Sequence, residues 1–131
     1  MELLSMAMKK NDLNIDDLTG IIISHDDIDH LGGLYEIKEA YPRVKVYTSS
    51  IEAPYVSGEQ KSLRLQQSED VFETLPIEIR TWALEFQNSL RAIRRIPVDY
   101  TLNVNTDYAE NIRIVHTPGH TPGHISIYIP S

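Results

Sequence analysis

The stretch Gly20-Ile21-Ile22-Ile23-Ser24-His25-Asp26-Asp27-Ile28-Asp29-His30-Leu31-Gly32-Gly33 organises the rest of this chain. It begins with a short β-branched run, Ile21 to Ile23, which favours a buried strand over a helix. Two histidines and three aspartates follow within the next seven residues. Imidazole and carboxylate together suit Zn²⁺, Mn²⁺ or Fe. The pattern therefore predicts a metal site at the carboxyl end of a buried strand.

The candidate ligands of this stretch are His25, Asp26, Asp27, Asp29 and His30. They cannot all face one way. In extended backbone, side chains alternate, so that His25, Asp27 and Asp29 share one side and the remaining aspartate points away. A turn at Ile28 would bring His30 beside Asp29, which gives two groups of ligands suited to two adjacent metals. The alternative is a solvated acidic turn with incidental histidines.

A second group of histidines argues against that alternative. It reads His116-Thr117-Pro118-Gly119-His120-Thr121-Pro122-Gly123-His124. The two Pro-Gly pairs exclude a helix and predict a rigid double turn between two strands. His120 lies between the turns and is the predicted metal ligand. His116 ends one strand and His124 begins the next, so both are expected to be hydrogen-bonded structural histidines.

Composition limits the classes of function. The chain has 131 residues, 41% of them hydrophobic and 24% charged, as expected for one globular domain. Its net charge of −7 argues against a nucleic-acid partner, which needs a basic face. No apolar run approaches the ~20 residues of a membrane span, and we expect no membrane partner. The chain has no cysteine and no signal-peptide pattern, which fits a cytoplasmic protein.

Local patterns predict alternating helices and strands. A helix at 34–41, stopped by Pro42, and a strand at 44–47 complete a βαβ unit with parallel strands. Further helices are expected at 15–18, 63–72 and 76–93, and further strands at 98–104, 112–115 and 125–129. A turn is expected at 105–107.

The helix after Pro76 offers two interpretations for its side chains. Trp82 and Phe86 fall at helical spacing and are expected to pack on the core, with a substrate pocket as the alternative. Arg91, Arg94 and Arg95 are expected to complement the helix dipole in solvent, with an anionic substrate as the alternative.

Both histidine motifs resemble those of the metallo-β-lactamase superfamily of metal-dependent hydrolases. The family's His-x-His-x-Asp-His motif corresponds to His25-Asp26-Asp27-Ile28-Asp29-His30, and its Gly-His-Thr motif to Gly119-His120-Thr121. The resemblance extends over roughly residues 13–128. It implies an α/β fold that is part of an αββα sandwich, with a mixed sheet and flanking helices.

The resemblance also implies roles for individual residues. His25, Asp27 and His120 would bind a first metal, and Asp29 and His30 a second, with one or two Zn²⁺ expected and Mn²⁺ or Fe as alternatives. A zinc-bound hydroxide, oriented by Asp29 as the catalytic residue, would hydrolyse an ester, lactone, thioester or similar bond of a small-molecule substrate. Asp27 stands where the family usually has histidine, and this harder ligand can shift metal preference.

The resemblance covers only the middle of the usual family domain. Family members carry further strands before the first helix, and a bridging aspartate and another histidine after the Gly-His-Thr motif. We therefore expect residues 1–131 to form a single, incomplete domain with exposed sheet edges, through which two copies could pair as a homodimer. The alternative function is a non-catalytic remnant that binds at most one metal or acts as an interaction module.

Overall fold

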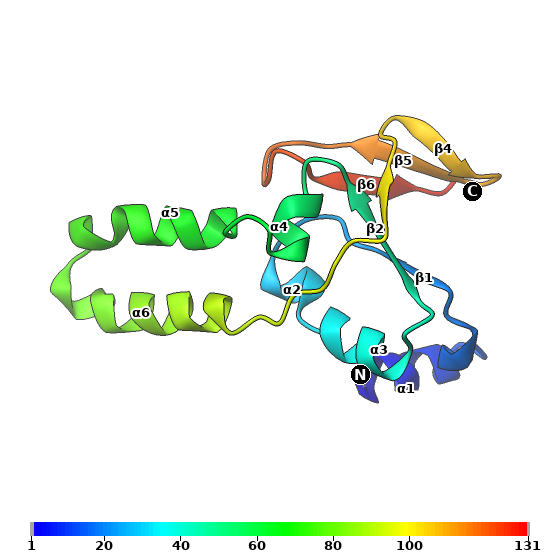
Figure 1. Ribbon diagram of the computed structural model, residues 1–131, viewed down its shortest axis with the longest axis horizontal. Helices are drawn as coiled ribbons and strands as arrows, with labels where there is room; N and C mark the ends of the chain where they lie inside the picture. Colours follow the sequence, from blue (N-terminus) through cyan, green and yellow to red (C-terminus); the bar gives the residue numbers. More distant parts are fainter. Residues whose placement is uncertain (1, 131) are drawn as a thin grey trace.

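Two three-stranded sheets form the centre of the protein, for which the computed structural model describes residues 2–130 (Figure 1). The first sheet is parallel, in the order β1 (Gly20–Ile22), β2 (Lys45–Ser49) and β3 (Tyr100–Leu102). The second sheet is antiparallel, in the order β4 (Thr106–Ala109), β5 (Ile112–His116) and β6 (Ile125–Tyr128). With its helices, this arrangement confirms the predicted α/β class.

The helices fall into a group on the body and a projecting arm. The α-helices are α1 (Glu2–Lys10), α2 (Ile28–Leu31), α3 (Leu34–Ala40), α4 (Ala53–Ser57), α5 (Leu63–Val71) and α6 (Ile77–Arg91). Two 3₁₀ turns complete the set, η1 (Ile15–Asp17) and η2 (Phe72–Thr74). Figure 1 shows α5 and α6 extending together away from the sheets. None of the helices in residues 2–130 is long and apolar enough to span a membrane.

The predicted βαβ unit is present. Strands β1 and β2 run parallel, with Ile21 opposite Val46, and α2 and α3 connect them. Helix α3 ends before Pro42, as a missing backbone N–H requires. Asn14 caps η1, since its side chain accepts a hydrogen bond from the Asp16 N–H.

Alternating side chains of the first sheet build two cores. Ile23 and Val46 face α2, α3 and α4, where they contact Leu31, Leu34 and Val56. Their chain neighbours Ile22 and Tyr47 lie on the opposite face and pack against the second sheet. That core is centred on Leu102, Ile114 and Ile125. Residues 2–130 thus build three consecutive layers of the expected sandwich: helices, parallel sheet and antiparallel sheet.

The expectation that Trp82 packs on the core is wrong. Its side chain is 64% exposed and stacks on Phe86 with the ring centroids 5.6 Å apart. Helix α6 instead packs on α5, where the Gln87 amide donates to the Ser68 carbonyl, and the buried residues of α6 are Ala83, Gln87 and Leu90. The helical spacing of its apolar residues is present, but the main packing partner of α6 is α5, the other helix of the arm.

Two further expectations need correction. Arg95 is not a solvated residue at a helix end, because it forms a largely buried ion pair with Asp26. The segment expected to be a turn at 105–107 is partly strand, since β4 begins at Thr106. Asn105 alone has the positive φ of a turn residue, at 59°.

Candidate metal centre

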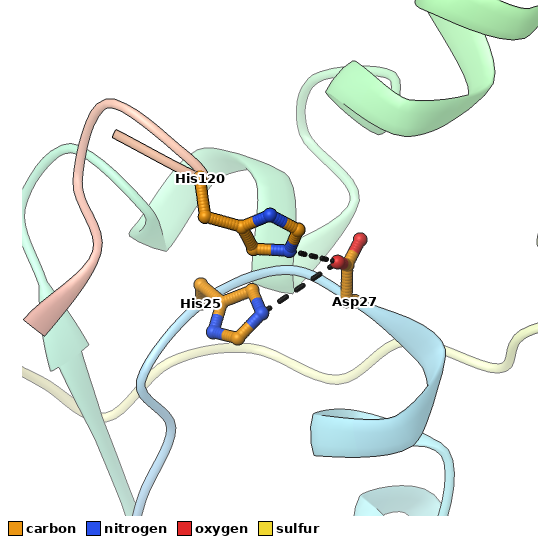
Figure 2. Close-up of side chains that lie close together, drawn as sticks. All are labelled: His25, Asp27 and His120. Atoms are coloured by element: carbon orange, nitrogen blue, oxygen red, sulfur yellow. Dashed lines mark hydrogen bonds and ion pairs between the residues drawn. The ribbon is translucent and has the colours of Figure 1, made fainter. Parts of the chain in front are cut away.

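Three of the predicted ligands converge although they come from distant parts of the chain. His25 follows β1, Asp27 precedes the first turn of α2, and His120 lies between β5 and β6. Figure 2 shows both imidazole rings pointing toward the Asp27 carboxylate. Asp27 Oδ2 is 2.6 Å from His120 Nε2 and 3.6 Å from His25 Nε2. One donor atom from each residue lies within 4.8 Å of the other two.

The environment sets the charge of two of these side chains. Burial lowers the pKa of His25, and the neighbouring His30 and His124 lower it further. Burial alone would raise the pKa of Asp27, but hydrogen bonds with His120 and Arg64 outweigh burial and lower it. At neutral pH His25 is therefore neutral and Asp27 is ionised. Metal ligation requires these forms, and two imidazoles with one carboxylate suit Zn²⁺, Mn²⁺ or Fe.

A hydroxyl group orients the histidines of the first motif. Ser24 Oγ lies 2.9 Å from His25 Nδ1 and 3.1 Å from His30 Nδ1. This contact engages the Nδ1 side of the His25 ring, and its Nε2 faces Asp27. Hydrogen bonds of this kind fix the ring orientation of metal-binding histidines.

Asp29 and His30 lie beside the three converging residues but outside their group. Both are in the short helix α2, where Asp29 Oδ2 is 3.5 Å from His30 Nε2. The Asp29 side chain is 75% exposed. The His30 ring centroid is 4.0 Å from that of His25. The pair is thus adjacent to the candidate centre, and its role as a second metal site stays a prediction.

The outer histidines of the second motif hold the double turn together. His116 Nε2 lies 2.9 Å from the Pro122 carbonyl oxygen, and His124 Nδ1 lies 2.9 Å from Thr117 Oγ1. Both make the hydrogen bonds expected of structural histidines. The His124 ring also packs 4.6 Å from the His25 ring, between centroids.

A buried glutamate that the sequence did not reveal ties the two motifs together. The fully buried Glu52 carboxylate accepts hydrogen bonds from the Asp26 N–H at 3.0 Å and the Gly123 N–H at 3.0 Å. It also accepts one from the Thr121 hydroxyl. The Ser49 hydroxyl also donates to the Gly123 carbonyl, at 2.7 Å. We call these contacts of Glu52 and Ser49 the clamp. These contacts fix the distance between the turn bearing Asp27 and the loop bearing His120.

A cavity of about 300 Å³ opens beside the candidate centre. Asp27 and His120 line one part of it, and Arg64 and Gln67 of α5 line another. Arg64 Nη2 is 3.3 Å from Asp27 Oδ2 and 3.4 Å from His120 Nε2. The sequence pattern gave no sign of Arg64, because α5 approaches the site only through tertiary folding.

Known proteins share this sequence and architecture. A model of the metallo-beta-lactamase superfamily matches residues 1–131. The chain belongs to this superfamily. Metallo-beta-lactamase superfamily proteins are generally metal-dependent hydrolases, and the expected family resemblance is confirmed.

One curated relative from this superfamily is the probable metallo-hydrolase YflN of Bacillus subtilis (strain 168). It is 30% identical over 113 residues, which cover 85% of this chain and 40% of YflN. The FEZ-1 metallo-beta-lactamase of Legionella gormanii superposes with a TM-score of 0.66 at 18% identity, covering 98% of this chain and 42% of FEZ-1. AidC, a dizinc quorum-quenching lactonase, gives a TM-score of 0.60 at 23% identity, covering 98% of this chain and 43% of AidC. These two structures support the fold, and the chain spans well under half the length of each relative.

Proposed function

We propose that this protein is a hydrolase that cleaves an ester, lactone, thioester or similar bond of a small molecule at a metal centre held by His25, Asp27 and His120. The convergence of three donor atoms within 4.8 Å carries the proposal, because two of them come from segments 93 residues apart. Membership of the superfamily supports the reaction class. The probable metallo-hydrolase YflN and the lactonase AidC support a hydrolytic function as well.

The residues present suit this chemistry. A bound Zn²⁺ would lower the pKa of a coordinated water and polarise the substrate carbonyl. His25 and His120 would each supply an imidazole nitrogen, and Asp27 a carboxylate oxygen. Asp29 would orient the attacking water, and with His30 it would bind a second metal. Water adds to the carbonyl carbon and the bond to the leaving group breaks, so that an acid and an alcohol or thiol form. One or two Zn²⁺ are proposed, with Mn²⁺ or Fe as alternatives.

Metal content tests the centre directly. Elemental analysis after gel filtration without chelator should find one metal per chain for the three-residue centre, or two if Asp29 and His30 also bind. His120→Ala should lose at least one metal. His116→Gln, at the end of β5, is the matched control, because the glutamine amide can still donate a hydrogen bond to the Pro122 carbonyl; it should keep the wild-type content.

Turnover tests the reaction. We expect the metal-loaded protein to hydrolyse at least one member of an ester, lactone and thioester panel, and Asp29→Asn to lower kcat by about 100-fold or more. Wild-type turnover in Asp29→Asn would refute the role of Asp29. Bound metal without turnover on any member would instead support a non-catalytic metal-binding module.

A further inference from the structure

We propose that Arg64 forms an anion-binding subsite, so that the substrate of the centre carries a carboxylate or a similar anionic group near the bond that is cleaved. This inference rests on the proposed hydrolase function and adds the charge of the substrate to it. It comes from the position of one guanidinium group between the candidate metal ligands and the neighbouring cavity.

Arg64 reaches the site from the first turn of α5. Ser62 caps this helix, since its hydroxyl accepts a hydrogen bond from the Leu65 N–H. The Arg64 side chain is 38% exposed and lines the cavity together with Gln67, one turn further along α5. Its two contacts with Asp27 and His120 both use Nη2. A guanidinium carries five N–H donors in a planar fork, so most of its donors are left for other partners.

The ion pair with Asp27 does not by itself explain why an arginine side chain lies at the candidate centre. A metal held by the Asp27 carboxylate would compete with Arg64 for its negative charge, and it would repel the guanidinium. Among the described residues that line the cavity, the only other carboxylate is Asp26, which is already paired with Arg95. In the metal-loaded protein the described lining of the cavity therefore leaves no carboxylate for Arg64, and an anionic substrate would supply one.

The cavity is suited to a small anionic substrate. Its volume of about 300 Å³ is at the lower end of the range for small-molecule pockets. Leu63 and Pro122 provide apolar lining, and Gln67 provides a neutral hydrogen-bonding group. Arg64 would bind a carboxylate with two parallel hydrogen bonds, which fixes the orientation of the substrate relative to Asp27 and His120.

Two esters of similar length test this specificity: mono-4-nitrophenyl glutarate, which is anionic, and 4-nitrophenyl butyrate, which is neutral. With the intact metal-loaded protein, kcat/KM should be higher for the glutarate ester by about tenfold or more. Arg64→Gln should lower this ratio about tenfold, and Arg64→Lys should restore part of it. Lys61→Gln is the matched control: it removes the same charge three residues earlier, where Lys61 pairs with Glu69 outside the cavity, and should leave the ratio unchanged.

Direct binding separates the subsite from the reaction. Calorimetry with glutarate, on proteins of equal zinc content, should show weaker binding to Arg64→Gln than to the wild type. If neither these esters nor any member of the ester, lactone and thioester panel is hydrolysed but glutarate binding depends on Arg64, the subsite stands and the proposed hydrolase function fails. If both esters are hydrolysed with equal efficiency and Arg64→Gln binds glutarate like the wild type, the subsite is refuted while the hydrolase function stands.

Discussion

Asp26 and Asp27 are neighbours in the sequence but have opposite environments. Burial raises the pKa of Asp26 even though Arg95 lies beside its carboxyl group. Hydrogen bonds with His120 and Arg64 lower the pKa of Asp27 against the effect of burial. The alternation of side chains predicted that Asp26 points away from the other candidate ligands. It could not predict Arg95, which is 69 residues further along the chain.

The close packing around Gly123 leaves no room for the methyl group of an alanine. A Cβ at this position would lie 2.8 Å from Glu52 Cγ and from Ile51 Cβ, and 2.9 Å from the Glu52 backbone nitrogen. The backbone would have to move away from Glu52 and Ser49. Gly123→Ala should therefore lower the free energy of unfolding by about 1–3 kcal/mol, measured by urea denaturation.

Gly33→Ala is the matched control for this substitution. Nothing lies within 4 Å of a Cβ at Gly33, and its φ of −92° is accessible to alanine. We expect Gly33→Ala to leave the free energy of unfolding nearly unchanged. Equal losses in the two variants would contradict the packing argument at Gly123.

At the level of elements, the sequence predicts best those helices and strands whose signals lie within the element itself or beside it in the chain. The strand β1, helix α3 and strand β2 follow from apolar periodicity and from Pro42, all within about 30 residues. The clamp at Glu52 could not be predicted, because its partners lie 26 to 71 residues away. The sequence could not show the orientation of Trp82 for the same reason, since only the tertiary structure shows that α6 packs on α5.

The clamp between the two motifs predicts that Glu52 controls metal affinity. Both carboxylate oxygens of Glu52 accept hydrogen bonds, so the Glu52→Gln amide would place an N–H₂ group against another donor. The loop bearing His120 would then loosen relative to Asp27. We expect Co²⁺ affinity to fall about tenfold, measured by competition with a chelator, with altered Co²⁺ absorption bands.

Gln87→Leu is a control for a general loss of stability. Gln87 is also a buried polar residue, but it lies in the α5–α6 arm and hydrogen-bonds to Ser68. This variant should keep wild-type Co²⁺ affinity even if it is less stable. A Glu52→Gln protein with unchanged affinity and spectrum would show that Glu52 supports only the fold.

At the level of the whole molecule, the candidate centre lies where the two sheets meet. Ser24, after β1, accepts a hydrogen bond from the N–H of Ile125 at the start of β6. The packing of the sheets therefore sets the spacing between His25 and His120. The sequence could name these ligands, but it could not give their distance. Pairing of two copies through sheet edges stays a prediction, which sedimentation analysis would test.

The first sheet also makes the stability of the whole protein depend on pH. Asp99, just before β3, accepts a hydrogen bond from the Val46 N–H of β2 at 2.8 Å. Its Oδ2 lies 3.2 Å from Lys38 Nζ of α3. The Val46 N–H and the nearby Lys38 lower the pKa of Asp99, although burial opposes them. One carboxylate thus links two strands and a helix, and these contacts are strongest when it is ionised.

Because the pKa of Asp99 is lowered in the folded protein, its contribution to the free energy of unfolding decreases as the pH falls. A carboxylate with a lower pKa in the folded state stabilises the protein fully above its unfolded pKa of about 3.9, and this contribution is lost as the pH falls through the folded value. Asp99→Asn should therefore lower the free energy of unfolding by about 1 kcal/mol at pH 7, and the difference from the wild type should shrink as the pH falls below about 4. Urea denaturation followed by circular dichroism at several pH values measures it. Asp70→Asn, at an exposed position of α5, should show no such difference at any pH. A gap for Asp99→Asn that stays constant down to pH 2 would mean that the charge of Asp99 does not hold the sheet together.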